Sequence, residues 1–175
     1  EADEGASAYG KRENKPTATL LLSRFLNPSF TDTSSPAHDR AVASMSAKTG
    51  MNDLDEYAVE EALRIAEAHG GNEEGGTHTI TLISMGPERA TEAVRKGLSM
   101  GANDAILVTD SALAGSDALA TSLVLAKALE GRGFDLIMFG SESTDARMSV
   151  VPAMVSARLG LPQMTFANKV EVSGS

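Results

Sequence analysis

Short apolar segments alternate with helix-like segments over residues 79–159, and this alternation constrains the fold more than any other feature of the chain. Three strand-like runs, TITLIS at 79–84, AILV at 105–108 and LIMF at 136–139, are joined by helical segments. Short apolar strands joined by helices indicate a parallel sheet that is covered on both faces. Right-handed crossovers then predict an α/β fold, a three-layer α/β/α sandwich with a mostly parallel sheet.

Capping and breaking residues predict where the helices begin and end. Asp53, with Glu56 three residues later, has the capping-box pattern at the start of a first helix, which Gly70 and Gly71 end. Ser116 is the expected cap of a helix over residues 117–130. The other two helices are expected after Pro87 and from about residue 149 to 159.

Apolar spacing predicts which helical residues face the core. In the second helix the expected inner face comprises Ala90, Ala93, Val94, Gly97 and Leu98. In the third helix it comprises Leu119, Leu123, Ala126 and Leu129.

Residues 1–50 differ from the rest of the chain because they show no sustained period. Residues 1–16 are polar and are expected to be mobile, whereas 17–22 (TATLLL) is expected to form one buried strand. We therefore divide the chain into an atypical, partly disordered segment at 1–50, a nucleotide-binding domain at 51–172 and a tail at 173–175. A last extended segment is expected at residues 164–172, at the end of this domain.

Charge and composition exclude several classes of function. The net charge of −9 argues against binding nucleic acid or an anionic membrane, because both depend on Lys and Arg. Without cysteines there is no disulfide or thiolate site, and the three histidines lack metal-ligand spacing. No apolar run is long enough to span a membrane, and the first residues lack the pattern of a signal peptide, so a cytoplasmic location is expected.

The polar run at residues 140–149 is the best candidate for a binding site, because it leads from an apolar strand into a helix. Ligands of such folds lie at the carboxyl ends of the strands, which selects this run and the ones at 85–86 and 109–115. A helix N-terminus suits phosphate, and hydroxyl groups and the Arg147 cation could add to it. A polar loop that only caps the helix is an equal alternative. Walker A, GxGxxG and catalytic-triad patterns are lacking, so binding without catalysis is expected.

Three runs resemble the β subunit of electron transfer flavoproteins. Residues 52–63 resemble its N-P-x-D-E-x-A-V-E-E-A-L segment, and residues 85–102 resemble its G-P-E…A-L-A-M-G-A-D segment. Residues 141–163 resemble its signature, Q/E-S-T-D followed by P-x-x-A-x-x-L-G-L-P-Q. The resemblance implies a Rossmann-like sandwich related to adenine nucleotide hydrolases.

By this resemblance, the chain is the β subunit of a heterodimer, and its partner is an α subunit that holds or shares FAD. The β subunit binds AMP, or a second FAD, and has no catalytic residues of its own. The heterodimer passes electrons from flavin-dependent dehydrogenases to a quinone-linked oxidoreductase. Two alternatives remain open: a stand-alone adenine-nucleotide-binding domain, and a truncated product without ligand.

The family's nucleotide contacts fall on specific positions of this sequence. Asn52 matches an asparagine that meets the nucleotide, Met85 matches a backbone contact, and Ser143, Thr144 and Asp145 match the phosphate loop. The candidate set is completed by Gly140, Arg147, Ser149 and Val151.

The chain departs from the family pattern in four respects. Asp53 replaces a proline, and the first strand lacks the family's Lys-x-V-P-D-T turn. Ala146, Met148 and Ser149 stand where the family often has glycine or a polar residue. The family continues beyond a segment like 164–172, so a truncated β subunit is expected.

Overall fold

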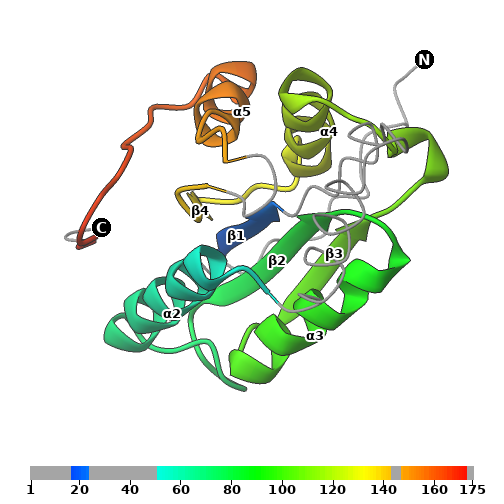
Figure 1. Cartoon of the computed structure of the whole chain (residues 1–175). Coiled ribbons are helices and arrows are strands. Elements are labelled where there is room, and N and C mark those ends of the chain that lie inside the picture. The colour runs from blue at the N-terminus through cyan, green and yellow to red at the C-terminus, as the bar shows by residue number, and fades with distance from the viewer. Residues whose placement is uncertain (1–16, 24–50, 143–146, 173–175) are drawn as a thin grey trace, which may run out of the picture.

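The computed structural model describes residues 51–142 and 147–172, together with the backbone of residues 17–23. Four strands form one parallel sheet in the order β3-β2-β1-β4. Helices α2 and α3 cover one face of this sheet and α4 and α5 the other, which confirms the predicted three-layer sandwich (Figure 1). The elements are β1 (Thr17–Ser23), α2 (Asp53–Ala68), β2 (Thr79–Met85), η2 (Glu88–Ala90), α3 (Thr91–Met100), β3 (Asp104–Val108), η3 (Ser111–Leu113), α4 (Ala118–Leu129), β4 (Leu136–Phe139) and α5 (Val151–Leu159).

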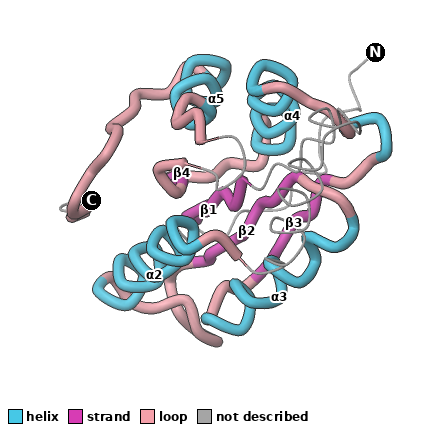
Figure 2. The backbone as a smooth tube through the Cα atoms, in the orientation of Figure 1, coloured by secondary structure: helices cyan, strands magenta, loops and turns pink. Residues whose placement is uncertain are grey.

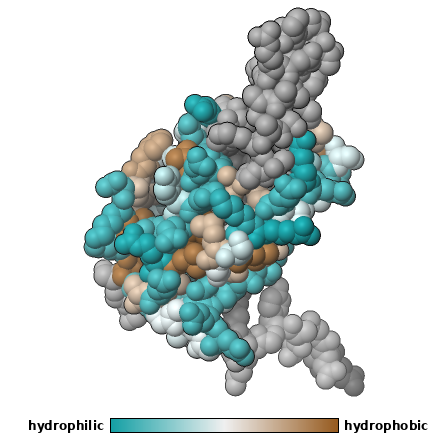
Figure 3. All heavy atoms as spheres, turned by 60° about the horizontal axis from the view of Figure 1, so that its bottom comes forward, coloured by the Kyte–Doolittle hydropathy of each residue, from teal (hydrophilic) through white to brown (hydrophobic). Residues whose placement is uncertain are grey.

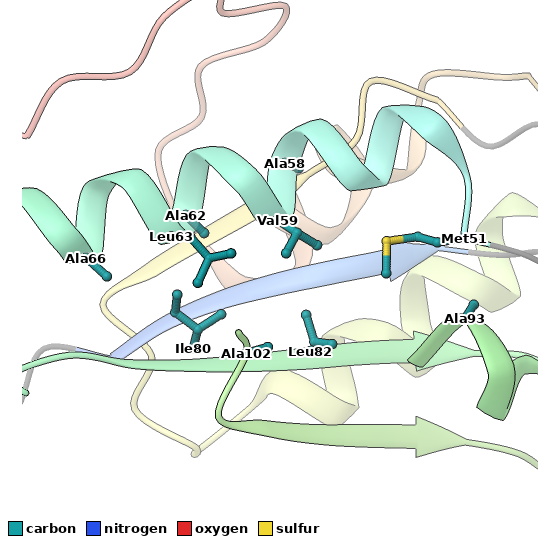
Figure 4. Close-up of a cluster of buried hydrophobic side chains, with 10 residues drawn as sticks. All are labelled: Met51, Ala58, Val59, Ala62, Leu63, Ala66, Ile80, Leu82, Ala93 and Ala102. Atoms are coloured by element: carbon teal, nitrogen blue, oxygen red, sulfur yellow. The ribbon is translucent and has the colours of Figure 1, made fainter. Parts of the chain in front are cut away.

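Strand β2 forms the centre of the core because both of its faces are covered. Ile80 and Leu82 pack with α2 and α3, whereas Ile83 and Met85 pack with α4 and α5. This alternation is the two-residue period of a strand. Figure 4 shows the cluster around Ile80 and Leu82, in which side chains of α2 point down onto the sheet. The apolar run TITLIS is therefore explained by burial on both sides.

Gly97 allows α3 to lie close to the sheet. A Cβ atom at this position would lie 2.5 Å from Leu82 Cδ1 and 2.9 Å from Met51 Cε. Met51, two residues before the start of α2, thus occupies space that a side chain at this position of α3 would need. The outer side of the α2 and α3 layer is mostly hydrophilic, with hydrophobic side chains visible between the polar ones (Figure 3). Lys96 and Glu56 form an ion pair that joins the two helices.

The predicted caps of two helices are each wrong by one residue. Asn52, rather than Asp53, is the N-cap of α2, and its side chain makes no capping hydrogen bond. Asp117, rather than Ser116, caps α4, since its carboxylate accepts a hydrogen bond from Ala120 N at 2.8 Å. Ser116 instead donates to the carbonyl of Leu113. In both cases two neighbouring residues have capping side chains, and local sequence does not choose between them.

Three leucines predicted to face the core are instead exposed. Leu119 and Leu123 of α4 are 58% and 46% exposed, and Leu98 of α3 is 37% exposed. The buried side of α4 carries Thr121, Ser122, Leu125, Ala126 and Leu129. Because α4 is apolar almost all round, apolar spacing does not identify its inner face.

The end of the described chain runs as an extended segment beside the sandwich (Figure 2). Residues 164–172 form no strand, and Met164 and Phe166 are 83% and 76% exposed. The Nε2 atom of His69, at the end of α2, lies 3.0 Å from the carbonyl oxygen of Val172. Within the described residues β4 is therefore an edge strand, which explains why its apolar residues are only half-buried.

Candidate functional site

The strand order places a topological switch point between β1 and β4. From β1 the chain proceeds through β2 to β3 on one side, and then returns to β4 on the other side. Ligands of open parallel sheets lie outside the carboxyl ends of the strands at such a point. The segment 140–150 between β4 and α5, here called the β4 loop, begins at this point as predicted. Residues 109–115 follow β3, which is separated from β4 by two strands, so this run lies away from the switch point.

Asn52 connects the N-terminus of α2 to the β4 loop. Its side-chain Nδ2 donates a hydrogen bond of 2.8 Å to the carbonyl oxygen of Glu142. Its own carbonyl accepts hydrogen bonds from the backbone N–H groups of Asp55 and Glu56. Asn52 is only 8% exposed, and its Oδ1 atom has no hydrogen-bond partner among the described residues. A buried acceptor without a donor is costly, so a donor from a ligand or a water molecule fits this position.

Gly140 brings the β4 loop directly against the first turn of α2. A Cβ atom at Gly140 would lie 2.4 Å from Asp55 Oδ1 and 3.0 Å from the carbonyl carbon and oxygen of Leu54. Asp55 is 2% exposed, so it has little room to move away. Only glycine therefore allows β4 to end this close to the helix.

Glu142 and Ser149 join the two ends of the β4 loop. The hydroxyl group of Ser149 donates to Glu142 Oε2 at 3.0 Å. Ser149 and Arg147 have positive φ angles of 52° and 47°, which L residues rarely adopt. Such backbone strain costs about 1–3 kcal/mol and often occurs at functional sites. Arg147 is exposed and makes no hydrogen bond or ion pair with any other described residue.

Met85 and Val151 lie in the core, so their side chains do not face an open site. They are 3% and 8% exposed and belong to the cluster that packs α4 and α5 against the sheet. Their predicted contacts would therefore involve backbone atoms at the end of β2 and the start of α5. The predicted phosphate-loop residues Ser143, Thr144 and Asp145 lie outside the described residues.

Sequence reasoning missed three polar residues at this end of the sheet. Glu142 is not among the predicted site residues, and its carboxylate accepts a hydrogen bond from Ser149. Asp55 is buried against Gly140, and Ser84 is fully buried with no partner for its hydroxyl among the described residues. A polar residue near the end of an apolar strand, as in TITLIS, is the one sequence signal that could have identified Ser84.

A groove of about 360 Å³ lies elsewhere, between α4 and α5. Its lining includes Glu130 and Leu159, at the C-terminal ends of these helices. Helices that connect parallel strands run antiparallel to them, so this groove lies toward the opposite end of the sheet from the β4 loop. The groove is open to solvent and is lined by both charged and apolar residues. Its size alone does not identify it as the binding site.

The family model of the electron transfer flavoprotein domain matches residues 40–175. The chain belongs to this family. The electron transfer flavoprotein subunit beta of Mycobacterium tuberculosis (strain ATCC 25618 / H37Rv) is 44% identical over 125 residues, which are 71% of this chain and 46% of that protein. The subunit beta of Thermoanaerobacterium thermosaccharolyticum is 40% identical over 124 residues, covering 71% of this chain and 45% of the relative.

A protein with a different name, Protein FixA of Azotobacter vinelandii, is also similar. It is 40% identical over 124 residues, covering 69% of this chain and 42% of FixA. The chain thus spans about half the length of the curated relatives that it matches. In the described part of the chain, no helix combines the length and apolarity needed to cross a membrane.

Proposed function

We propose that the chain is the nucleotide-binding part of an electron transfer flavoprotein β subunit, formed by residues 51–172. The nucleotide, AMP or a second FAD, lies at the switch point between the N-terminus of α2 and the β4 loop. The observation that carries this proposal is the buried Asn52 Oδ1, which has no donor among the described residues at the point where α2 and the β4 loop meet.

The residues present have donors and acceptors that suit a nucleotide. Asn52 Oδ1 accepts a hydrogen bond from an amine or hydroxyl group of the ligand. The N–H groups of Asp53 and Leu54 in the first turn of α2 receive no side-chain cap from Asn52 and add donors at the same edge. From the sequence, Gly140, Ser143, Thr144, Asp145, Arg147 and Ser149 form the phosphate side, and Met85 and Val151 contribute backbone groups. The nucleotide supplies binding and structural order, and we propose no bond-making by this chain.

The partner follows from the same assignment. We propose a heterodimer with an α subunit that holds or shares FAD, located in the cytoplasm. FAD supplies the redox chemistry, receiving electrons from flavin-dependent dehydrogenases and passing them to a quinone-linked oxidoreductase. The β chain would orient the α subunit and stabilise the assembly.

Mass spectrometry of the purified protein and of the small molecules released on denaturation tests this function. We expect AMP or FAD in near-stoichiometric amount, and a yellow α chain that co-purifies when both chains are expressed together. A bound nucleotide without an α partner would instead favour a stand-alone nucleotide-binding domain. No nucleotide, and no binding when AMP or FAD is titrated, would refute the cofactor assignment.

The variant Asn52→Ala shows whether the proposed position is correct. It removes the side-chain amide that carries the proposal and should release the nucleotide. Asn168→Ala is the matched control, because Asn168 is exposed on the C-terminal segment. Equal nucleotide content in both variants would place the ligand elsewhere on the molecule.

A further inference from the structure

Ser84 is a second buried polar residue at the end of the sheet where Asn52 lies. Its side chain is fully buried, and its hydroxyl group has no hydrogen-bond partner among the described residues. Because side chains alternate along a strand, Ser84 lies on the same face of the sheet as Ile80 and Leu82, the face that α2 and α3 cover. A polar group that is buried without a partner costs free energy, so a group from outside the protein fits this position.

The N-terminus of α2 lies over the same end of the sheet as Ser84. Met51, next to Asn52 in the chain, packs in one cluster with Leu82. Figure 4 shows Met51 toward the arrowheads of the strands. Ser84 is two residues farther along β2 than Leu82, so it lies toward the same arrowheads. Two polar side chains, each less than one-tenth exposed and each with an atom that lacks a partner in the described part of the chain, thus lie at one end of one face.

The chemistry of these two groups suits the neutral part of a nucleotide. Asn52 Oδ1 can only accept a hydrogen bond, whereas the Ser84 hydroxyl can both donate and accept. A nucleoside offers hydroxyl and amine donors together with ring-nitrogen acceptors, whereas a phosphate group at neutral pH offers mainly acceptors. Both residues are enclosed by protein, and burying a charge costs much more than burying neutral groups that are hydrogen-bonded.

On this basis, and resting on the proposed nucleotide site, we propose that Ser84 is a further ligand-binding residue, which holds the adenosine part of the nucleotide together with Asn52. AMP and FAD share this part, so the assignment applies to either ligand. The nucleoside lies on the face of the sheet that α2 and α3 cover, and the phosphate side extends to the β4 loop. The ligand supplies the partner that the Ser84 hydroxyl lacks, so this hydroxyl contributes to binding and not to the stability of the ligand-free fold.

Calorimetric titration of adenosine and of AMP, combined with urea unfolding without ligand, tests this role. Ser84→Ala should weaken the binding of both ligands by the same factor, roughly three- to tenfold for one hydrogen bond. Its midpoint of urea unfolding should equal or exceed that of the wild type, because a buried hydroxyl without a partner is removed. Thr121→Val is the matched control, since Thr121 of α4 is also fully buried with no partner for its hydroxyl among the described residues, but lies across the sheet. It should leave both affinities unchanged.

Unchanged affinity for both ligands in Ser84→Ala would assign the hydroxyl to a water molecule and overturn the role of Ser84, but not the proposed function. Weaker binding of AMP alone would place the hydroxyl beside the phosphate and would also overturn it, as would an equal loss of affinity in Thr121→Val. If neither ligand binds to the wild-type protein, the proposed function fails together with this inference. Should Ser84→Ala not fold, Ser84→Cys replaces the hydroxyl with a weakly hydrogen-bonding thiol, and the same loss of affinity for both ligands is expected.

Discussion

The side-chain amide of Asn52 donates a hydrogen bond of 2.8 Å to the carbonyl oxygen of Glu142, a residue 90 positions away in the sequence. This contact joins the N-terminus of α2 to the β4 loop, beside the switch point between β1 and β4. It also places the Oδ1 atom of Asn52, which has no hydrogen-bond partner in the described part of the chain, at the site where we propose that a nucleotide binds.

Replacing Asn52 should destabilise the fold as well as weaken binding. In Asn52→Ala the Glu142 carbonyl loses its donor, and leaving a partly buried acceptor unsatisfied costs about 1–3 kcal/mol. Urea unfolding monitored by circular dichroism measures this change in the free energy of unfolding. Asn168→Ala should stay within about 0.5 kcal/mol of the wild type. Equal stability of both variants would contradict the structural role of the Asn52 contact.

Gly140 should tolerate no side chain, because α2 lies too close. A methyl group would lie 2.4 Å from Asp55 Oδ1 and 3.0 Å from Leu54 backbone atoms, so Gly140→Ala should cost about 1–3 kcal/mol or more. The free energy of unfolding of Gly140→Ala can be compared with that of Ser141→Ala, at the exposed neighbouring position. If Gly140→Ala were as stable as the control, the close approach of the β4 loop to α2 would be disproved.

Two leucines of α4 offer a direct test of how this helix is oriented. Leu125 is completely buried, whereas Leu123 is 46% exposed. Leu125→Ala should therefore destabilise the protein by about 2–5 kcal/mol, and Leu123→Ala by less than about 1 kcal/mol. Thermal or urea unfolding of the two variants measures the difference. If Leu123→Ala destabilised the protein more than Leu125→Ala, the inner face of α4 would be the one that apolar spacing predicts.

The predicted phosphate loop yields a prediction about affinity. If residues 143–145 contact the phosphate of AMP, Ser143→Ala and Asp145→Ala should each weaken AMP binding by about 1–3 kcal/mol. Calorimetric titration of AMP against both variants, with Ser141→Ala as the control, tests this expectation. Unchanged affinity in both variants would exclude these side chains from the site.

The sequence predicted the layers of this fold well because they depend on patterns that are local. The runs TITLIS, AILV and LIMF became β2, β3 and β4, since short apolar segments between helices have few other ways to be buried. The inner face of α4 was not predictable in this way. Its outer leucines are as apolar as its inner ones, and only the packing of α5 decides which side is buried.

The candidate site was predictable only in part. The position of the β4 loop followed from the strand-end rule, and Asn52 followed from the family resemblance. The contact between Asn52 and Glu142 was not predictable, because it depends on β4 lying beside β1 and on Gly140 lying against α2. Contacts between residues so far apart in the chain cannot be recognised from the spacing of residue types in a single sequence.

The most direct test of the nucleotide site is amide chemical-shift mapping of ¹⁵N-labelled protein during titration with AMP. We expect the largest shifts at the side-chain amide of Asn52 and at the backbone amides of Gly140, Glu142 and Ser149. Saturation of these shifts at a single affinity would support one site at the switch point. Shifts concentrated in the groove between α4 and α5, or no shifts at all, would contradict it.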